Sequence, residues 1–308
     1  MKTLITGASG FIGSEVVKSR AARFRLVSRN LRSNPIETDE SDIFYVESID
    51  SSTDWTGAFG NIDSVLHLAG LAHNKDSKPA DYDEVNFLGT IRLAQEAQKQ
   101  GVKRFVFVST IGVLGRCSKE GPLNRFSSTA PYDCYSKSKL KAERALQELA
   151  SKGSMELVIV RPTLVYGAHA PGNFQKLVKL VNLSPILPFG LANNRRSFIS
   201  VYNLSDLLLR CLTHEQAAGH IFHACEQEPI STKDFVNKVA KGLNKSLIQA
   251  KIPPKLMKVF LTCIGKKITY DQLFGDLEVD GACSQKTLNW SPPYTIDESM
   301  KFLRNTND

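Results

Sequence analysis

A tyrosine and a lysine four residues apart, Tyr135 and Lys139, are the pair in this chain best suited to moving a proton. On a helix, residues at this spacing lie on the same face. A free phenol has a pKa near ~10, and lowering it to about 7 requires roughly 4 kcal/mol of preferential stabilisation of the anion. A neighbouring ammonium supplies part of this by Coulomb attraction. The pair predicts a general acid or base, although a surface helix carrying Tyr and Lys has the same pattern.

A glycine-rich segment, GASGFIG over residues 7–13, directly follows the apolar run of residues 3–6. Glycines at this spacing between a strand and a helix are typical of a loop that holds the pyrophosphate of a dinucleotide. The first helical turn offers free amides to the anion. The alternative is a plain strand-to-helix turn. The positions expected to contact the cofactor are Gly7, Ser9, Gly10, Phe11, Ile12 and Gly13.

Two arginines, Arg29 and Arg32, follow the second predicted strand, and no carboxylate lies between residues 26 and 35. An NAD site usually places an acidic residue here for the ribose 2′-hydroxyl. A guanidinium instead pairs with a 2′-phosphate, so the sequence favours NADP(H) over NAD(H), with NAD(H) still possible. The alternative is that both arginines are solvated loop residues.

Thr110 completes the predicted catalytic group. It follows the predicted strand of residues 104–109, where its hydroxyl would contact the reacting oxygen. The nicotinamide would exchange a hydride while Tyr135 exchanges a proton, and its positive ring would add to the effect of Lys139 on the phenol. Lys139 would also hold the ribose hydroxyls.

The first half of the chain alternates short apolar runs with helical patterns. This predicts an α/β fold, a Rossmann-type doubly wound parallel sheet with helices on both faces. After Pro162, loops rich in Gly, Pro and Asn interrupt shorter elements. We expect an NAD(P)-binding domain over residues 1–165 and a mainly substrate-binding lobe over 166–308, with the chain re-entering the first domain around 195–225. Strands are expected at residues 3–6, 24–28, 44–46, 64–68, 104–109 and 157–161, and the clearest helices at 82–100 and 135–151.

Over nearly its whole length the chain resembles the extended short-chain dehydrogenases/reductases of the nucleotide-sugar epimerase/dehydratase type. The motifs that carry the resemblance are residues 7–13, His67-Leu68-Ala69-Gly70, Asn86, Ser109-Thr110, residues 135–139 and Arg161-Pro162-Thr163-Leu164-Val165-Tyr166-Gly167.

The resemblance implies that Ala69 and Gly70 lie against the cofactor ribose and that Pro162 to Leu164 flank the nicotinamide. Asn86 belongs to the same cofactor-binding set. It also implies a UDP-sugar substrate whose diphosphate is held by Asn173 and Arg196. Asn173 is otherwise a turn residue and Arg196 a charge at a strand edge. The family further implies a homodimer formed by the helices around residues 82–100 and 135–151.

One departure from the family narrows the chemistry. Sugar-nucleotide dehydratases follow the active-site Thr with Asp-Glu, whereas Thr110 is followed by Ile111-Gly112. This leaves reduction of a 4-keto group or 4-epimerisation. The arginines after the second strand favour a 4-ketoreductase, similar to the bacterial reductases that form UDP-N-acetylquinovosamine or its epimer for surface polysaccharides. The alternatives are a UDP-glucose or UDP-N-acetylglucosamine 4-epimerase and, more remotely, a non-catalytic dinucleotide sensor.

The remaining features carry less chemistry. His73 would touch the substrate sugar or be a solvated loop residue, and the histidines at 214, 220 and 223 show no metal-ligand spacing, so no metal is expected. The net charge of +8 suits an anionic partner, but no nucleic-acid motif is present. Six cysteines without a CxxC pair, and a start that leads directly into a strand, predict a cytoplasmic protein with free thiols. Residues 251–267 are either a lobe helix or an interfacial helix on an anionic membrane, without stable insertion.

Overall fold

A seven-stranded parallel sheet forms the centre of the computed structural model, which describes residues 1–19, 23–29, 42–72 and 77–306. The strand order is β10-β6-β5-β4-β1-β2-β3, and every neighbouring pair is parallel. The strands are β1 (Lys2–Thr6), β2 (Arg23–Ser28), β3 (Ile43–Tyr45), β4 (Ser64–His67), β5 (Arg104–Val108), β6 (Glu156–Pro162) and β10 (Ile221–Ala224). The predicted doubly wound α/β fold is confirmed.

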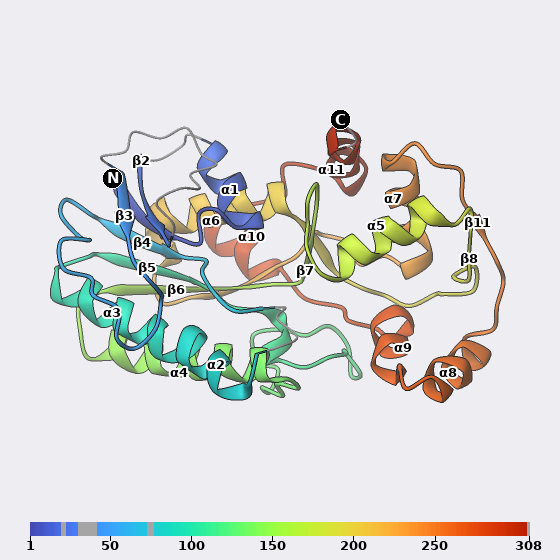
Figure 1. The fold of residues 1–308 in the computed structure, drawn as a ribbon, viewed down its shortest axis with the longest axis horizontal. Helices are drawn as coiled ribbons and strands as arrows, with labels where there is room; N and C mark the ends of the chain where they lie inside the picture. Colours follow the sequence, from blue (N-terminus) through green and yellow to red (C-terminus); the bar gives the residue numbers. More distant parts are fainter. Residues whose placement is uncertain (20–22, 30–41, 73–76, 307–308) are drawn as a thin grey trace.

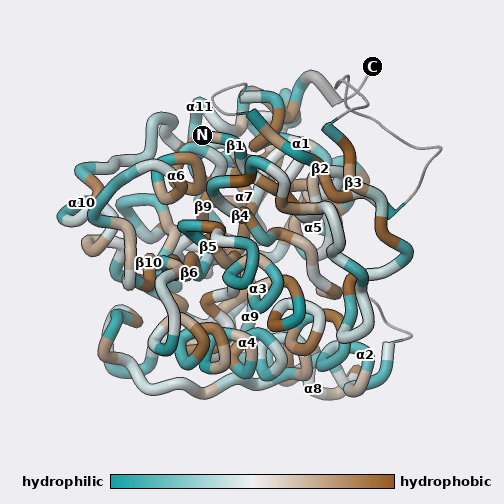
Figure 2. Tube along the Cα trace, turned by 90° about the vertical axis from the view of Figure 1, so that its left-hand side faces the viewer, coloured by the Kyte–Doolittle hydropathy of each residue, from teal (hydrophilic) through white to brown (hydrophobic). Residues whose placement is uncertain are grey.

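Helices cover both faces of the sheet (Figure 1), so its central strands are buried on both sides. In β5, Phe105 and Phe107 join the apolar cluster under α3 (Gly89–Lys99) and α4 (Cys134–Ser151). Val106 and Val108 join the cluster under α1 (Phe11–Lys18) and α6 (Val201–Thr213). Since successive strand side chains point to opposite faces, this continuous apolar run supplies both layers of the core. Figure 2 shows β5 and β6 between these two helical layers.

The helix expected over residues 82–100 is three elements instead of one. α2 (Pro79–Asp83) is followed by a π-helical turn at Glu84–Leu88 and then by α3. A π turn shifts the register of the side chains that follow and is frequent at functional sites. Here it carries Asn86, which is fully buried.

The smaller lobe is built mostly from residues after β6. It contains the paired strands β7 (Leu164–Tyr166) and β9 (Phe198–Ser200), and an aromatic core in which the rings of Phe198 and Phe235 stack at 3.9 Å. β9 leads into α6 and then into β10, which pairs with β6 at the edge of the main sheet. The other elements of the lobe are α5 (Asn173–Leu183), β8 (Ile186–Leu187), α7 (Thr232–Gly242), β11 (Ile248–Gln249), α8 (Pro254–Cys263), α9 (Lys267–Phe274) and α11 (Ile296–Lys301). Helix α10 (Ala282–Leu288) instead adds Leu288 to the cluster under α1 and α6.

The direction of chain winding reverses between β1 and β4, which are neighbours in the sheet. From β1 the chain moves outward through β2 and β3, and it then returns to β4 and moves the other way. In such sheets ligands bind in the crevice beyond the carboxyl ends of the two strands at this point. A ligand is therefore expected beside the loops that follow Thr6 and His67.

Candidate active site

The loop after β1 has the close packing that glycine alone permits. Gly7 has a φ of +73°, and a Cβ there would lie 2.8 Å from the backbone nitrogen of Ala69. A Cβ on Gly13 would lie 2.2 Å from the carbonyl oxygen of Gly7. Gly10 is the N-cap of α1 and offers no side chain to its first amides. A loop packed this closely, with no side chain capping the first amides of α1, fits the pyrophosphate of a dinucleotide.

The other loop residues differ in their surroundings. Ser9 is exposed, while Phe11 and Ile12 are half-buried. Ile12 packs against the apolar cluster under α1 and α6. The ring of Phe11 lies 3.5 Å from the position of a Cβ on Gly167, so the glycine loop adjoins the loop after β7.

Asn86 connects the loop after β4 to α4. Its amide group accepts a hydrogen bond from Leu71 N at 2.7 Å and donates to Leu71 O at 3.0 Å and to Ser138 Oγ at 3.0 Å. A Cβ on Gly70 would lie 3.0 Å from Asn86 Oδ1 and 3.3 Å from Lys139 Nζ. The predicted ribose-contacting loop and the predicted catalytic lysine are therefore neighbours.

Lys139 is buried, at 2 % exposure, behind the carboxyl end of β5. Its Nζ donates to Val108 O at 2.9 Å and lies 4.5 Å from the centre of the Phe107 ring. Burial lowers the pKa of this ammonium to about 8. Thr110 begins a 3-10 turn at the same strand end, and its Oγ1 accepts from Gly112 N at 3.1 Å. The Thr110 hydroxyl retains its proton for donation.

Tyr135 lies in the first turn of α4, whose N-cap is Asp133. Burial raises the pKa of the Tyr135 phenol, and the nearby Asp133 carboxylate and Tyr132 raise it further. This is opposite to the lowering expected from the Tyr135–Lys139 spacing. The main reason is burial of the phenol, to which the charge of the Asp133 carboxylate adds, while the Lys139 ammonium is directed to Val108 O. The protein's own side chains therefore do not lower the pKa of Tyr135 toward that of a phenolate.

Two guanidinium groups lie near Tyr132 without a carboxylate partner among the described residues. Arg196 is 9 % exposed, donates to Gly275 O at 2.8 Å, and has its pKa lowered to about 10 by burial. Arg116 lies 4.3 Å above the centre of the Tyr132 ring, and its buried Nε has no hydrogen-bond partner among the described residues. The charges of both arginines act on the pKa of Tyr132. Nothing in the type or spacing of Arg116 distinguishes it in the sequence.

A third buried guanidinium, Arg161, has a very different environment. It forms two hydrogen bonds to the carboxylate of Glu143, at 3.0 Å and 2.6 Å, joining β6 to α4. Glu143 follows Lys139 by one helical turn and is 1 % exposed. This paired arrangement satisfies both charges.

The remaining predicted positions lie around this region or outside the described residues. Pro162 ends β6 and Leu164 begins β7. Asn173 is exposed at the start of α5, with its Oδ1 3.5 Å from Lys176 Nζ. Arg29 is exposed just after β2 and pairs with no described residue. Arg32 and His73 lie outside the described residues.

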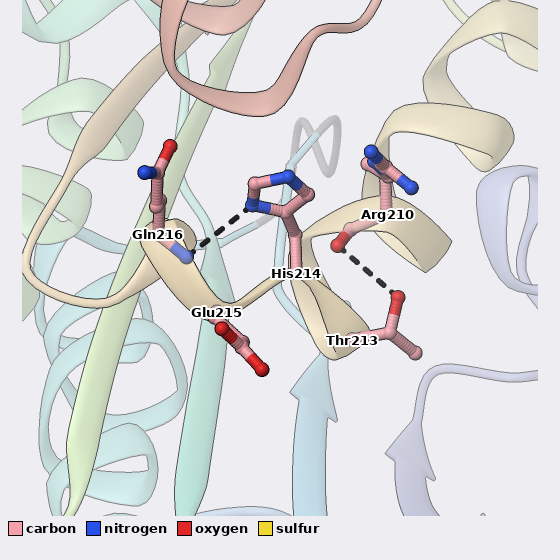
Figure 3. A pocket seen from close by; sticks show the side chains of 5 residues that line it. All are labelled: Arg210, Thr213, His214, Glu215 and Gln216. Carbon is pink, nitrogen blue, oxygen red and sulfur yellow. Dashed lines mark hydrogen bonds between the residues drawn. The ribbon is translucent and has the colours of Figure 1, made fainter.

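Two surface hollows are separate from these residues. One, of about 410 Å³, lies at the end of α6 among Arg210, Thr213, His214, Glu215 and Gln216 (Figure 3). It is at the amino end of β5, since Arg104 donates to the carbonyl of His214 at 2.9 Å, and so lies away from the crevice. The other, of about 480 Å³, lies beyond β10 and includes Glu226, Glu228, Glu278 and Asp280, a poor environment for a diphosphate.

Within the described ranges, no group of three or more His, Cys, Asp and Glu residues could hold a metal ion. The same part of the chain contains no helix long and apolar enough to cross a bilayer.

Comparison with known proteins gives one family match. Residues 3–225 match the family described as the NAD dependent epimerase/dehydratase family. The chain is 38% identical over 304 residues to a UDP-glucose 4-epimerase of Vibrio cholerae, covering 97% of this chain and 93% of the relative. It is 27% identical to the N-acetyl-alpha-D-glucosaminyl-diphospho-ditrans,octacis-undecaprenol 4-epimerase of Escherichia coli O157:H7, covering 81% and 75%.

Among solved structures, the UDP-glucose 4-epimerase of Thermotoga maritima with UDP-glucose superimposes with a TM-score of 0.77 at 20% identity. The match covers 99% of this chain and 98% of that one. At this identity the likeness concerns the fold.

Proposed function

Because the chain is an enzyme of the NAD dependent epimerase/dehydratase family, we propose that it reduces the C4 ketone of a UDP-linked 4-keto sugar, with NADPH as the hydride source. The proposal depends most on the residues that follow Thr110. Ile111, Gly112 and Val113 are all buried and none can exchange a proton. The positions after Thr110 thus add no acid or base to Tyr135, and Tyr135 as proton donor suffices for ketone reduction but not for removing water.

The proposed proton transfer assigns one role to each catalytic side chain. The raised pKa of Tyr135 keeps the phenol protonated at neutral pH, as a proton donor to the C4 oxygen must be. Thr110 would donate a hydrogen bond to the same oxygen. Lys139 would use the N–H groups not bound to Val108 O to hold ribose hydroxyls. When bound, the reduced nicotinamide supplies the hydride.

The diphosphate of the substrate would be held by Arg196 and Arg116. Arg196 is buried and Arg116 is half-buried, and neither forms an ion pair with a described carboxylate. A diphosphate would provide the negative charge that these guanidinium groups lack in the protein itself. Asn173, at the start of α5, would add an amide donor.

The proposed preference for NADP(H) depends on Arg29 and Arg32. Arg29 is exposed after β2, the position from which a 2′-phosphate would be contacted. Arg29→Ala should weaken NADPH binding much more than NADH binding, measured by fluorescence titration. Equal effects would contradict the 2′-phosphate contact.

A second candidate function is 4-epimerisation of a UDP-sugar. It is favoured by the 38% identity to a relative named UDP-glucose 4-epimerase. An epimerase regenerates its cofactor within each turnover, whereas a reductase consumes it.

One experiment separates the two functions. The purified protein is mixed with a UDP-4-keto sugar and NADPH, and separately with UDP-glucose or UDP-N-acetylglucosamine without added cofactor. The reductase predicts NADPH loss equal to product formed, and no interconversion in the second mixture. Interconversion without added cofactor, together with tightly bound NAD after purification, would establish the epimerase instead.

We also propose that the enzyme works as a homodimer in the cytoplasm, in the supply of sugars for surface polysaccharides. The proposed dimer contact involves α3 and α4, and light scattering of the purified protein tests it.

A further inference from the structure

Helix α8 carries apolar side chains on two faces, although packing within the lobe uses one. Leu261 is buried and Met257 half-buried on the inner face. On the outer side, Leu256 and Val259 are each 61 % exposed and Phe260 is 58 % exposed. These three residues have the i, i+3, i+4 spacing of a single helical stripe, which a helix normally buries.

Further exposed apolar residues gather at the same end of the molecule. Ile186 of β8 and Ile248 of β11 are paired in register, and they are 52 % and 64 % exposed. Leu183, at the end of α5, is 83 % exposed. Figure 1 shows α8, β8 and β11 at the end of the long axis away from the parallel sheet. We call Leu183, Ile186, Ile248, Leu256, Val259 and Phe260 the distal face. Apolar side chains exposed together, as in the α8 stripe and the Ile186–Ile248 pair, indicate a docking surface, whereas single exposed residues do not.

The chain around the distal face is strongly basic. Between Asp234 and Asp271 there is no acidic residue, while eight lysines are present. Five of these lysines are exposed and form no ion pair within the described part of the chain: Lys245, Lys251, Lys255, Lys258 and Lys266. Apolar side chains bordered by unpaired lysines match a surface that is apolar beneath a layer of negative charge.

We propose that the distal face docks on an anionic phospholipid bilayer. The side chains of Leu256, Val259 and Phe260 enter the boundary between headgroups and acyl chains, while the lysines contact the headgroups. The contact is peripheral, because α8 has 10 residues and a spanning helix needs about 20. A second copy of this chain is a poor occupant, since a two-fold contact would bring the same lysines together. The proposal is independent of the reaction catalysed.

Co-sedimentation with vesicles tests the proposal. The protein should bind vesicles of phosphatidylcholine with phosphatidylglycerol, not phosphatidylcholine alone, and binding should weaken as salt is raised. Leu256→Ser, Val259→Ser and Phe260→Ser together should weaken binding at least about 30-fold. Lys255→Gln with Lys258→Gln should weaken it about tenfold or more, because each lysine near an anionic surface contributes roughly fivefold.

Matched controls use equally exposed residues elsewhere. Phe126→Ser, at a ring that is 81 % exposed, and Lys99→Gln with Lys103→Gln should leave vesicle binding unchanged. Thermal melting of each variant checks that the fold is intact. Binding of the triple serine variant at the parental level would overturn the proposal. A lower oligomeric mass of that variant, with parental vesicle binding, would assign the face to a second copy instead.

A spectroscopic probe provides an independent readout. The two native tryptophans, Trp55 and Trp290, are 2 % and 6 % exposed. Val259→Trp adds an indole on the distal face, and its emission should shift to shorter wavelength with anionic vesicles. An unchanged spectrum while the protein sediments with those vesicles would show that α8 is not the contacting element.

Discussion

Helix α4 borders two regions that differ in whether their buried charged side chains form ion pairs. Behind it, Arg161 of β6 meets Glu143 through two hydrogen bonds, and both side chains are almost fully buried. Around its amino-terminal turns, Lys139 and Arg196 are also buried, and among the described residues they donate hydrogen bonds to backbone carbonyls. Arg116 lies above an aromatic ring. In the first region the buried cation has a carboxylate partner within the protein. In the second region the cations form no ion pair with a described residue.

The difference separates charges that hold the fold from charges that await a ligand. A buried ion pair contributes little net stability over an apolar pair, but removing one partner is costly. A buried cation without a directly paired anion destabilises the protein. Burial lowers the pKa of both Lys139 and Arg196, and the charges of Glu143 and Asp276 offset this only in part. Such a cost is expected where a charge serves binding or catalysis. The following predictions test this separation, beginning with the largest expected effect.

Tyr135→Phe should lower the turnover rate by about 10²–10⁴-fold, since it removes the proposed proton donor and little volume. Binding of cofactor and UDP-sugar, measured by calorimetry, should change little. Tyr132→Phe is the matched control, because it keeps the ring beneath Arg116. A Tyr135→Phe rate within tenfold of the parent would remove Tyr135 from the mechanism.

Glu143→Gln should lower the free energy of unfolding by about 3–5 kcal/mol, because it leaves the Arg161 guanidinium buried without its counter-charge. Urea unfolding measures the loss. Replacing both partners, Glu143→Met with Arg161→Met, should recover most of it. If the double variant is as unstable as Glu143→Gln, the ion pair is not the source of the effect.

Lys139→Met should abolish turnover and yet stabilise the protein at pH 7 by up to about 3 kcal/mol, reduced by loss of the bond to Val108 O. The folded pKa of Lys139 is lowered from 10.5 to about 8. Below pH 8 the folded protein therefore holds a buried charge that disfavours folding. Between pH 8 and 10.5 the folded state releases this proton while the unfolded state keeps it, so the advantage of the variant should shrink and disappear.

Urea unfolding at pH 7 and near pH 10 provides the measurement for Lys139→Met. A variant that is less stable than the parent at both pH values would show that the ammonium contributes to the fold. Lys139 would then, like Arg161, be a charged side chain that stabilises the fold.

Arg196→Met should weaken UDP binding by roughly 10–100-fold, the usual contribution of a hydrogen bond to a charged group. Its free energy of unfolding should fall far less than that of Glu143→Gln. Arg195→Met is the control: this neighbouring side chain is exposed and pairs with Glu278 at 2.6 Å, so no measurable change in UDP binding is expected. Equal weakening by both variants would contradict a specific role for Arg196.

Most of the sheet was predictable because its strands are short apolar runs between turn residues. The predicted runs at residues 104–109 and 157–161 correspond to β5 and β6. The interruption of the helix over residues 82–100 could not be predicted, because the side chains of this segment suit a continuous helix. The π turn has Asn86 within it, and this side chain bonds both Leu71 and Ser138. Those partners are far apart in the sequence.

Local patterns by themselves determined the glycine loop, the Tyr135–Lys139 pair and the doubly wound fold. Each depends on residues close together in the chain, where spacing maps directly onto helix and strand geometry. Only the tertiary structure decided which charges are paired. The sequence does not show which of Arg116, Arg161 and Arg196 is paired, because packing gives Arg161 a carboxylate and no described carboxylate pairs with the other two. The pKa of a buried group likewise depends on neighbours that only the folded chain brings within a few ångströms.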